Sequence, residues 1–115
     1  MREVFTDLLA VDGVKGVVFF SAAGEVLFEE FPIRAAPRPP LRDWRALLGA
    51  VAGFREADLL FAKGRIYIRA APVGTLIVAT GRIAPSALIR LTCDILMPAL
   101  AQLKPVKGLR RFFSR

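Results

Sequence analysis

The chain of 115 residues contains no histidine, a single cysteine and no glycine-rich phosphate-binding motif. The absence of histidine removes the commonest general base and metal ligand. One thiol, Cys93, cannot form a disulfide within the chain or make a zinc site by itself. Neither GxxxxGK[ST] nor GxGxxG occurs, so no nucleotide-phosphate cradle is expected. We therefore expect no catalytic residue, no metal site and no cofactor.

No segment has the pattern of a membrane span or of a secretory signal. The most apolar stretch, residues 83–103, is interrupted by Arg90, Asp94 and Pro98, which favours a buried amphipathic helix. The first residues include Glu3 and Asp7, and no long apolar run follows them. Together with the single thiol, these features predict a cytoplasmic protein.

Apolar residues are abundant, at 55% of the chain, whereas 23% of residues are charged. A chain of this length is expected to fold as one domain around one core. Its apolar content lies near the upper end for a soluble protein, so one copy is expected to expose more apolar surface than it can bury. Association with a second copy or with a partner is the expected remedy.

The net charge of +7 is concentrated at the C-terminus, where residues 104–115 hold five cations and no acid. Residues 1–103 are nearly balanced, so we do not expect nucleic-acid binding by the body of the protein. We divide the chain into a domain over 1–103 and a basic amphipathic tail over 104–115.

The tail combines its cations with apolar residues that are costly to leave in water, since burying one phenylalanine is worth about 1.5 to 3 kcal/mol. Three roles are open: a solvated end, a strip that docks on a partner or on the domain itself, and attachment to an anionic membrane surface. We favour docking and assign five tail residues to partner binding: Lys107, Arg110, Arg111, Phe112 and Phe113.

Sequence periodicity predicts three helices and five strands. Apolar spacings of three and four predict helices over residues 2–11, 41–51 and 85–103. Runs of β-branched and aromatic residues predict strands over residues 14–20, 26–31, 57–62, 65–71 and 75–80. The intervening residues 32–40 contain four prolines and predict an extended connector.

The first and last strands are apolar at nearly every position, which is typical of central strands covered on both faces. In the first strand, Val14, Val18 and Phe20 are expected on one face, and Val17 and Phe19 on the other. The strand over 65–71 instead has one polar face, formed by Arg65, Tyr67 and Arg69. The strand over 26–31 is expected at an edge because it carries adjacent glutamates.

The last helix is expected to bury a wide apolar face. Its main stripe is predicted from Leu88, Leu91 and Ile95, continued by Ala99 and Leu103. Flanking apolar residues widen this stripe: Ile89, Leu96 and Leu100. Cys93 is expected to be buried there as a small hydrophobic residue.

This element order predicts an α+β fold with a five-stranded, mostly antiparallel sheet of strand order 2-1-5-4-3. The exception is expected where the first and fifth strands meet, which we predict to run parallel. One helix, residues 41–51, is expected on one face of the sheet, and the other two helices on the opposite face.

The sequence resembles the roadblock/dynein light chain family, and in particular its prokaryotic roadblock-like domains. The resemblance covers roughly residues 3–103. It lies in Leu9 and Gly13–Val18, in the turn at Ser21–Leu27, and in Gly64–Ile68 followed by Leu76–Val78. The proline-rich connector departs from the family pattern. Longin, profilin, GAF and PAS domains share this sheet order and remain alternatives for the fold.

The resemblance implies a homodimer in which the third strand and the second helix of each copy meet. The expected interface consists of Trp44, Leu47, Leu48, Val51, Leu59 and Phe61. The resemblance also implies a non-catalytic regulatory or scaffold protein that binds a small Ras-like GTPase, as an activator or an adaptor. We assign Arg42 and Arg45 to this partner. The alternatives are a ligand-sensing GAF/PAS-like domain and a membrane-associated adaptor that acts through the basic tail.

Overall fold

A computed structural model describes residues 2–31, 41–62 and 64–102 of the chain. In order, the elements are α1 Arg2–Leu9, β1 Val14–Ser21, β2 Val26–Glu30, α2 Leu41–Ala50, β3 Glu56–Phe61, β4 Gly64–Ala71, β5 Gly74–Thr80 and α3 Ser86–Gln102. Every predicted helix and strand is present, with ends that differ by one or two residues. The predicted connector at 32–40 and the tail at 104–115 lie outside the described residues.

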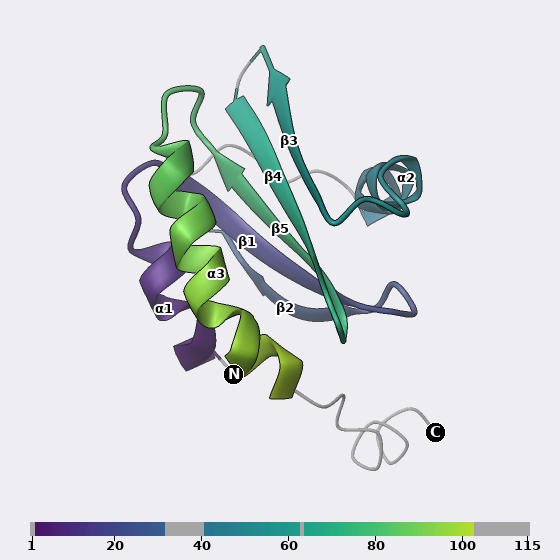
Figure 1. The fold of residues 1–115 in the computed structure, drawn as a ribbon. Helices are drawn as coiled ribbons and strands as arrows, with labels where there is room; N and C mark the ends of the chain where they lie inside the picture. Colours follow the sequence, from purple (N-terminus) through teal and green to yellow (C-terminus); the bar gives the residue numbers. More distant parts are fainter. Residues whose placement is uncertain (1, 32–40, 63, 103–115) are drawn as a thin grey trace.

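The strands form one sheet in the predicted order, β2-β1-β5-β4-β3. Helices α1 and α3 cover one face and α2 lies on the other (Figure 1), as predicted. This arrangement leaves β2 and β3 as the two edges of the sheet. No described helix is both long and apolar enough to cross a membrane.

The prediction that the first and fifth strands run parallel was wrong, because β1 and β5 pair antiparallel. Strand β2 reverses direction after β1, and the α2 connection brings the chain back as β3 in the same direction as β2. Two hairpins then follow, β3 to β4 and β4 to β5. Because each hairpin reverses the chain, β5 runs in the same direction as β3 and therefore as β2. Since β2 is antiparallel to β1, β5 must also run opposite to β1.

The start of β1 also differs from the prediction. The pairing of β1 with β5 shifts register between Val14 and Gly16, so one extra residue lies in β1 at this point. A bulge of this kind reverses the side of the sheet on which the preceding side chain lies. Val14 accordingly packs with the α1–α3 side of the core instead of with Val18 and Phe20.

The main core lies between the sheet and the α1–α3 layer. Phe5 of α1 stacks on Phe28 of β2 with ring centroids 4.3 Å apart, and it also contacts Phe19 of β1. Fully buried aromatic and aliphatic side chains dominate this cluster, and each contributes about 1.5 to 3 kcal/mol to folding. The α1–α3 layer is therefore fixed firmly to the sheet.

Helix α3 buries the flanking residues of its predicted apolar face, whereas the predicted main stripe lies outside the core. Its buried residues are Ile89, Cys93, Leu96 and Leu100, which recur at spacings of three and four. Cys93 is buried, as predicted, but Leu88, Leu91 and Ile95 point to solvent. Both sets fit the helical period, and the sheet packs against the set that contains the small Cys93 side chain.

Candidate interaction surface

The face of the sheet under α2 carries a smaller core. Val18 and Phe20 of β1, Ile68 of β4 and Ile77 of β5 are buried there. Helix α2 and the residue that follows it cover them with apolar side chains that themselves remain only partly buried: Leu47, Leu48 and Val51. Among the described residues, this buried core is therefore bordered by apolar side chains that stay partly in contact with solvent.

Strand β3 borders the same face and is an edge strand. It pairs with β4 alone, and no described strand lies along its other side. Its side chains alternate, so Ala57, Leu59 and Phe61 lie on the α2 side. An unpaired edge with apolar side chains is a template for pairing with another chain.

The structure thus brings together most of the predicted interface. Leu47, Leu48, Val51 and Leu59 pack against one cluster, and Phe61 is exposed at the end of β3. Trp44 belongs to α2, but its side chain lies outside what the structure describes.

The residues assigned to a partner are only partly described. Arg45 is exposed on α2, beside the predicted interface. Arg42 also lies in α2, without a described side chain. The five tail residues, Lys107, Arg110, Arg111, Phe112 and Phe113, lie outside the described residues.

Two exposed apolar residues beside this surface were not predicted. Phe54 lies in the link between α2 and β3, and Leu60 lies on the face of β3 that points away from α2. Phe54 had no helical or strand period to mark it. Leu60 follows Leu59 directly, so strand alternation alone indicated that one of the two side chains points outward.

A hollow of about 580 Å³ lies between the end of α2 and the sheet. Its size is typical of small-molecule sites. Its lining is mostly small or apolar, with polar side chains from Ser21, Arg45 and Thr75. The Ser21 hydroxyl already accepts hydrogen bonds from the backbone N–H groups of Ala23 and Glu25. A ligand-sensing site needs several converging polar groups, and the described lining of this hollow offers few.

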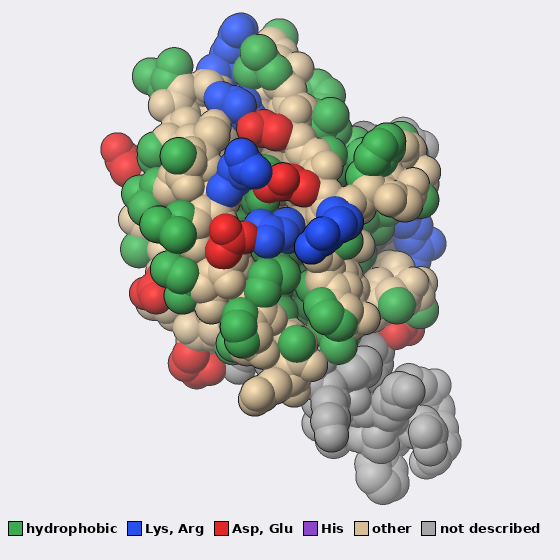
Figure 2. Space-filling model, in the orientation of Figure 1, with side chains coloured by type: hydrophobic (Ala, Val, Ile, Leu, Met, Phe, Trp, Pro, Cys, Tyr) green, Lys and Arg blue, Asp and Glu red, His purple; other side chains and the backbone are tan. Residues whose placement is uncertain are grey.

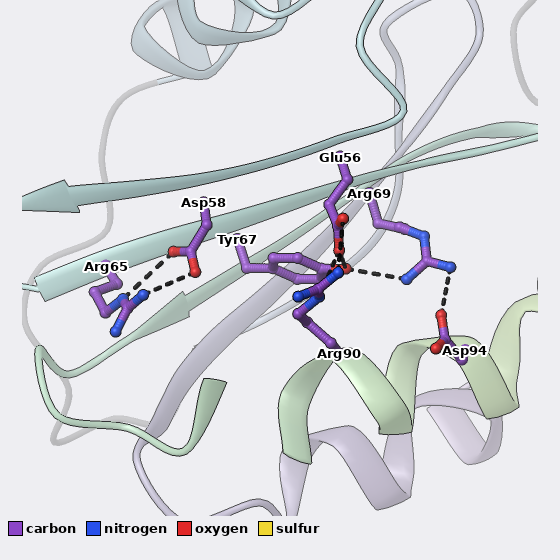
Figure 3. A network of polar contacts seen from close by, with 7 residues as sticks. All are labelled: Glu56, Asp58, Arg65, Tyr67, Arg69, Arg90 and Asp94. Carbon is purple, nitrogen blue, oxygen red and sulfur yellow. Dashed lines mark hydrogen bonds and ion pairs between the residues drawn. The ribbon is translucent and has the colours of Figure 1, made fainter. Parts of the chain in front are cut away.

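On the opposite face, a polar network joins α3 to β3 and β4 (Figure 3). The Tyr67 hydroxyl donates a hydrogen bond to Glu56, and Arg90 of α3 donates to the same carboxylate, with Nε at 2.9 Å. Arg69 donates to the Tyr67 oxygen at 3.0 Å and forms an ion pair with Asp94 of α3. The polar face predicted for the middle strand therefore holds α3 in position.

The network shifts the pKa values of its members. The hydrogen bond from Tyr67, followed by that from Arg90, lowers the pKa of Glu56 despite an opposing effect of burial. Burial, followed by the hydrogen bond to Glu56, raises the pKa of Tyr67 to about 12. Burial alone would lower the pKa of Arg69, but hydrogen bonds with Asp94 and Tyr67 raise it. The arginines and carboxylates of this network stabilise one another's charges, and Tyr67 joins them through hydrogen bonds.

A further pair, Arg65 and Asp58, is bidentate, with distances of 2.8 and 3.3 Å. Sequence reasoning noted the alternation of Arg65, Tyr67 and Arg69 but did not identify their partners. The signal was present, because Glu56 and Asp58 also alternate along the neighbouring strand.

Comparison with known proteins identifies the fold. No family model and no curated protein matches the sequence. Among solved structures, the gliding protein MglB of Thermus thermophilus is 22% identical, with a TM-score of 0.69 over 88% of this chain and 85% of that protein.

Two further solved structures have a similar fold. An MglB with a tetrameric arrangement is 20% identical, with a TM-score of 0.69 over 88% of this chain and 85% of that one. The Roadblock/LC7 domain from Streptomyces avermitilis is 22% identical, with a TM-score of 0.66 over 84% of this chain and 94% of that one. The chain therefore has the Roadblock/LC7 fold that its sequence pattern predicts.

Proposed function

We propose that this chain is a non-catalytic cytoplasmic homodimer that acts as a regulatory or scaffold protein and binds a small Ras-like GTPase. The observation that carries the proposal is the surface formed by α2 and β3. There, partly exposed apolar side chains lie beside a strand edge along which no described strand pairs. A surface of this kind is built for association with another polypeptide.

A second copy of the chain fits this surface best. Pairing of β3 with β3 across a two-fold axis would join the two sheets and satisfy both strand edges. The α2 helices would then meet over the apolar cluster and bury Trp44, Leu47, Leu48 and Val51, while Leu59 and Phe61 would contact their counterparts. Support comes from the fold, since an MglB of the same fold forms a tetrameric arrangement.

The Ras-like GTPase is proposed from the roadblock resemblance together with the basic residues on α2. A two-fold dimer would place Arg42 and Arg45 of both copies on one side of the assembly. Four guanidinium groups there would attract a partner with an acidic surface and speed its association. Both activation of the GTPase and an adaptor role fit this arrangement, and a hydrolysis assay on the isolated pair would separate them.

Capture from native lysate tests the proposed partner. The chain is immobilised, GDP or a slowly hydrolysed GTP analogue is added, and bound proteins are identified by mass spectrometry. We expect a small GTPase whose capture depends on the nucleotide. The double variant Arg42→Glu, Arg45→Glu should capture several-fold less, mainly because association slows.

The matched control is the double variant Lys15→Glu, Arg82→Glu, which makes the same change of charge at exposed residues away from α2. Its capture should equal that of the unmodified chain. Equal capture by all three proteins would remove Arg42 and Arg45 from the partner surface. If the same proteins were captured in equal amounts with GDP and with the GTP analogue, the proposal of a GTPase partner would be contradicted.

A further inference from the structure

The outer face of α3 is an apolar stripe that the proposed dimer does not cover. Leu88, Leu91 and Ile95 are 47%, 55% and 68% exposed. They lie at helical spacings, and the exposed Pro98 and Ala99 continue the stripe towards the end of the helix. Because α3 and α2 lie on opposite faces of the sheet, pairing through α2 leaves this stripe in water.

The margins of the stripe differ in charge. On the side facing β4, Arg90 and Asp94 are held in ion pairs with Glu56 and Arg69. Figure 2 shows this side as a band of alternating basic and acidic side chains. On the other side lies α1, with exposed carboxylates at Glu3 and Asp7, one helical turn apart. Helix α1 therefore contributes two exposed carboxylates to this margin, and its first residue is the basic Arg2.

The chain itself supplies a segment of complementary chemistry at this place. Residues 104–115 continue directly from the C-terminal end of α3, which lies near the N-terminal end of α1 (Figure 1). They carry five cations and no acid, together with Val106, Leu109, Phe112 and Phe113. The apolar side chains of this segment match the stripe, and its cations complement the carboxylates of Glu3 and Asp7.

The length of the segment also fits. Leu91 lies about 16 Å back along α3 from its last residue, at about 1.5 Å per residue. Residues 106–115 would span about 15 Å as a helix and about 33 Å if extended. Pro105 cannot continue the hydrogen bonding of α3, which favours a change of chain direction before Val106. As a helix, the segment from Val106 to Phe113 spans about 10 Å, which brings Phe113 level with Ile95. If extended, it spans about 23 Å, and Phe113 also reaches Leu91.

We propose that residues 104–115 fold back over the outer face of α3, placing apolar side chains on Leu88, Leu91 and Ile95 and cations beside Glu3 and Asp7. The tail is then a segment that covers its own domain, and partners or membranes compete with α3 for it. This inference rests on the surface of α3 and not on the proposed GTPase partner.

Methyl NMR of the full chain tests the contact. We expect cross-relaxation between the ring protons of Phe112 or Phe113 and the methyl groups of Leu91 or Ile95. Replacing both phenylalanines by alanine should shift the methyl signals of the stripe through lost ring currents. Methyl signals of Ile68 and Ile77, which lie on the α2 side, should not move.

A variant pair tests the surface. Leu91→Asp with Ile95→Asp should abolish cross-relaxation between the phenylalanine rings and the methyl groups that remain in the stripe, those of Leu88, while the circular dichroism of the fold persists, because both replaced side chains are exposed. Val26→Asp, an exposed apolar residue of β2, is the matched control and should retain the contact. Loss of the contact in both variants would contradict a specific site on α3.

Three further outcomes would overturn the proposal. The first is that the contact is absent from the full chain. The second is that the contact appears only between differently labelled copies. The third is that the methyl signals of the stripe shift only when vesicles containing phosphatidylserine are added. The second outcome would identify another copy as the occupant of the stripe, and the third an anionic membrane.

Discussion

Individual residues of the core behave as their chemistry requires, and Cys93 is the clearest case. Its thiol is completely buried under α3, and burial raises its pKa to about 12. A single cysteine within an apolar helical pattern was sufficient to predict this burial. The sequence did not indicate the direction of the neighbouring leucines, because α3 carries apolar residues around most of its circumference.

The raised pKa of Cys93 predicts weakening of the fold at alkaline pH. The folded protein holds the thiol proton more tightly than the unfolded chain, whose thiol has an ordinary pKa of 9.0. The resulting stability is complete below pH 9 and is lost as the pH rises towards 12. We expect the free energy of unfolding, measured in urea, to fall above about pH 9.

The variant Cys93→Ala isolates this effect. Its alkaline loss should begin nearer pH 10, where the ordinary pKa of Tyr67 lies, because burial of Tyr67 then remains the cause. The same pH profile in the variant and in the unmodified chain would show that Cys93 is not responsible. At neutral pH, the unmodified thiol should react with disulfide reagents only as fast as the protein opens.

Among the elements, the strand order and helix placement followed from local patterns, whereas three features did not. The direction of β5 relative to β1 depends on the crossover through α2. The side of Val14 depends on a bulge that no local pattern marks. The buried face of α3 is chosen by its fit to the sheet. Each of these is set by tertiary packing, which outweighs a local period when the period allows two answers.

The attachment of α3 to β3 and β4 predicts sensitivity to acid. The lowered pKa of Glu56 means that its contribution to stability is present above its ordinary pKa of 4.5 and is lost as the pH falls below it. Because the ion pair with Arg90 is exposed to solvent, its contribution is small and should decrease further as salt is added. Glu56→Gln should therefore flatten the loss of stability between about pH 5 and pH 3.

Asp58→Asn serves as the matched control for Glu56→Gln. It breaks an ion pair from the same strand, with Arg65 of β4, that does not involve α3. Stability curves at several pH values, followed by circular dichroism in urea, provide the comparison. If Asp58→Asn changes the acid slope as much as Glu56→Gln does, the attachment of α3 is not its cause.

At the scale of the whole molecule, the two faces of the sheet differ in how fully the helices cover them. The α1–α3 layer covers one core, whereas the described apolar side chains of α2 over the other core stay partly exposed beside the β3 edge. The apolar composition predicts an excess of exposed apolar surface, and the proposed position of an interface comes from the roadblock resemblance. The partner and its site remain the least predictable part, because they depend on a second molecule whose surface this sequence does not encode.

Edge variants of similar exposure should distinguish the two sides of the sheet. Phe61 at the end of β3 is 46% exposed and Val26 at the start of β2 is 40% exposed. We expect Phe61→Asp to weaken dimerisation, because it would bury a charge at the interface. Val26→Asp should leave the dimer intact. Sedimentation velocity over a range of concentrations would compare the two, and equal dissociation constants would move the interface away from β3.

The molar mass of the unmodified chain in solution tests the account most directly. Light scattering coupled to size-exclusion chromatography at micromolar concentration should give about twice the 12.6 kDa of one chain. A single species of 12.6 kDa would contradict the proposed dimer and the partner surface built on it.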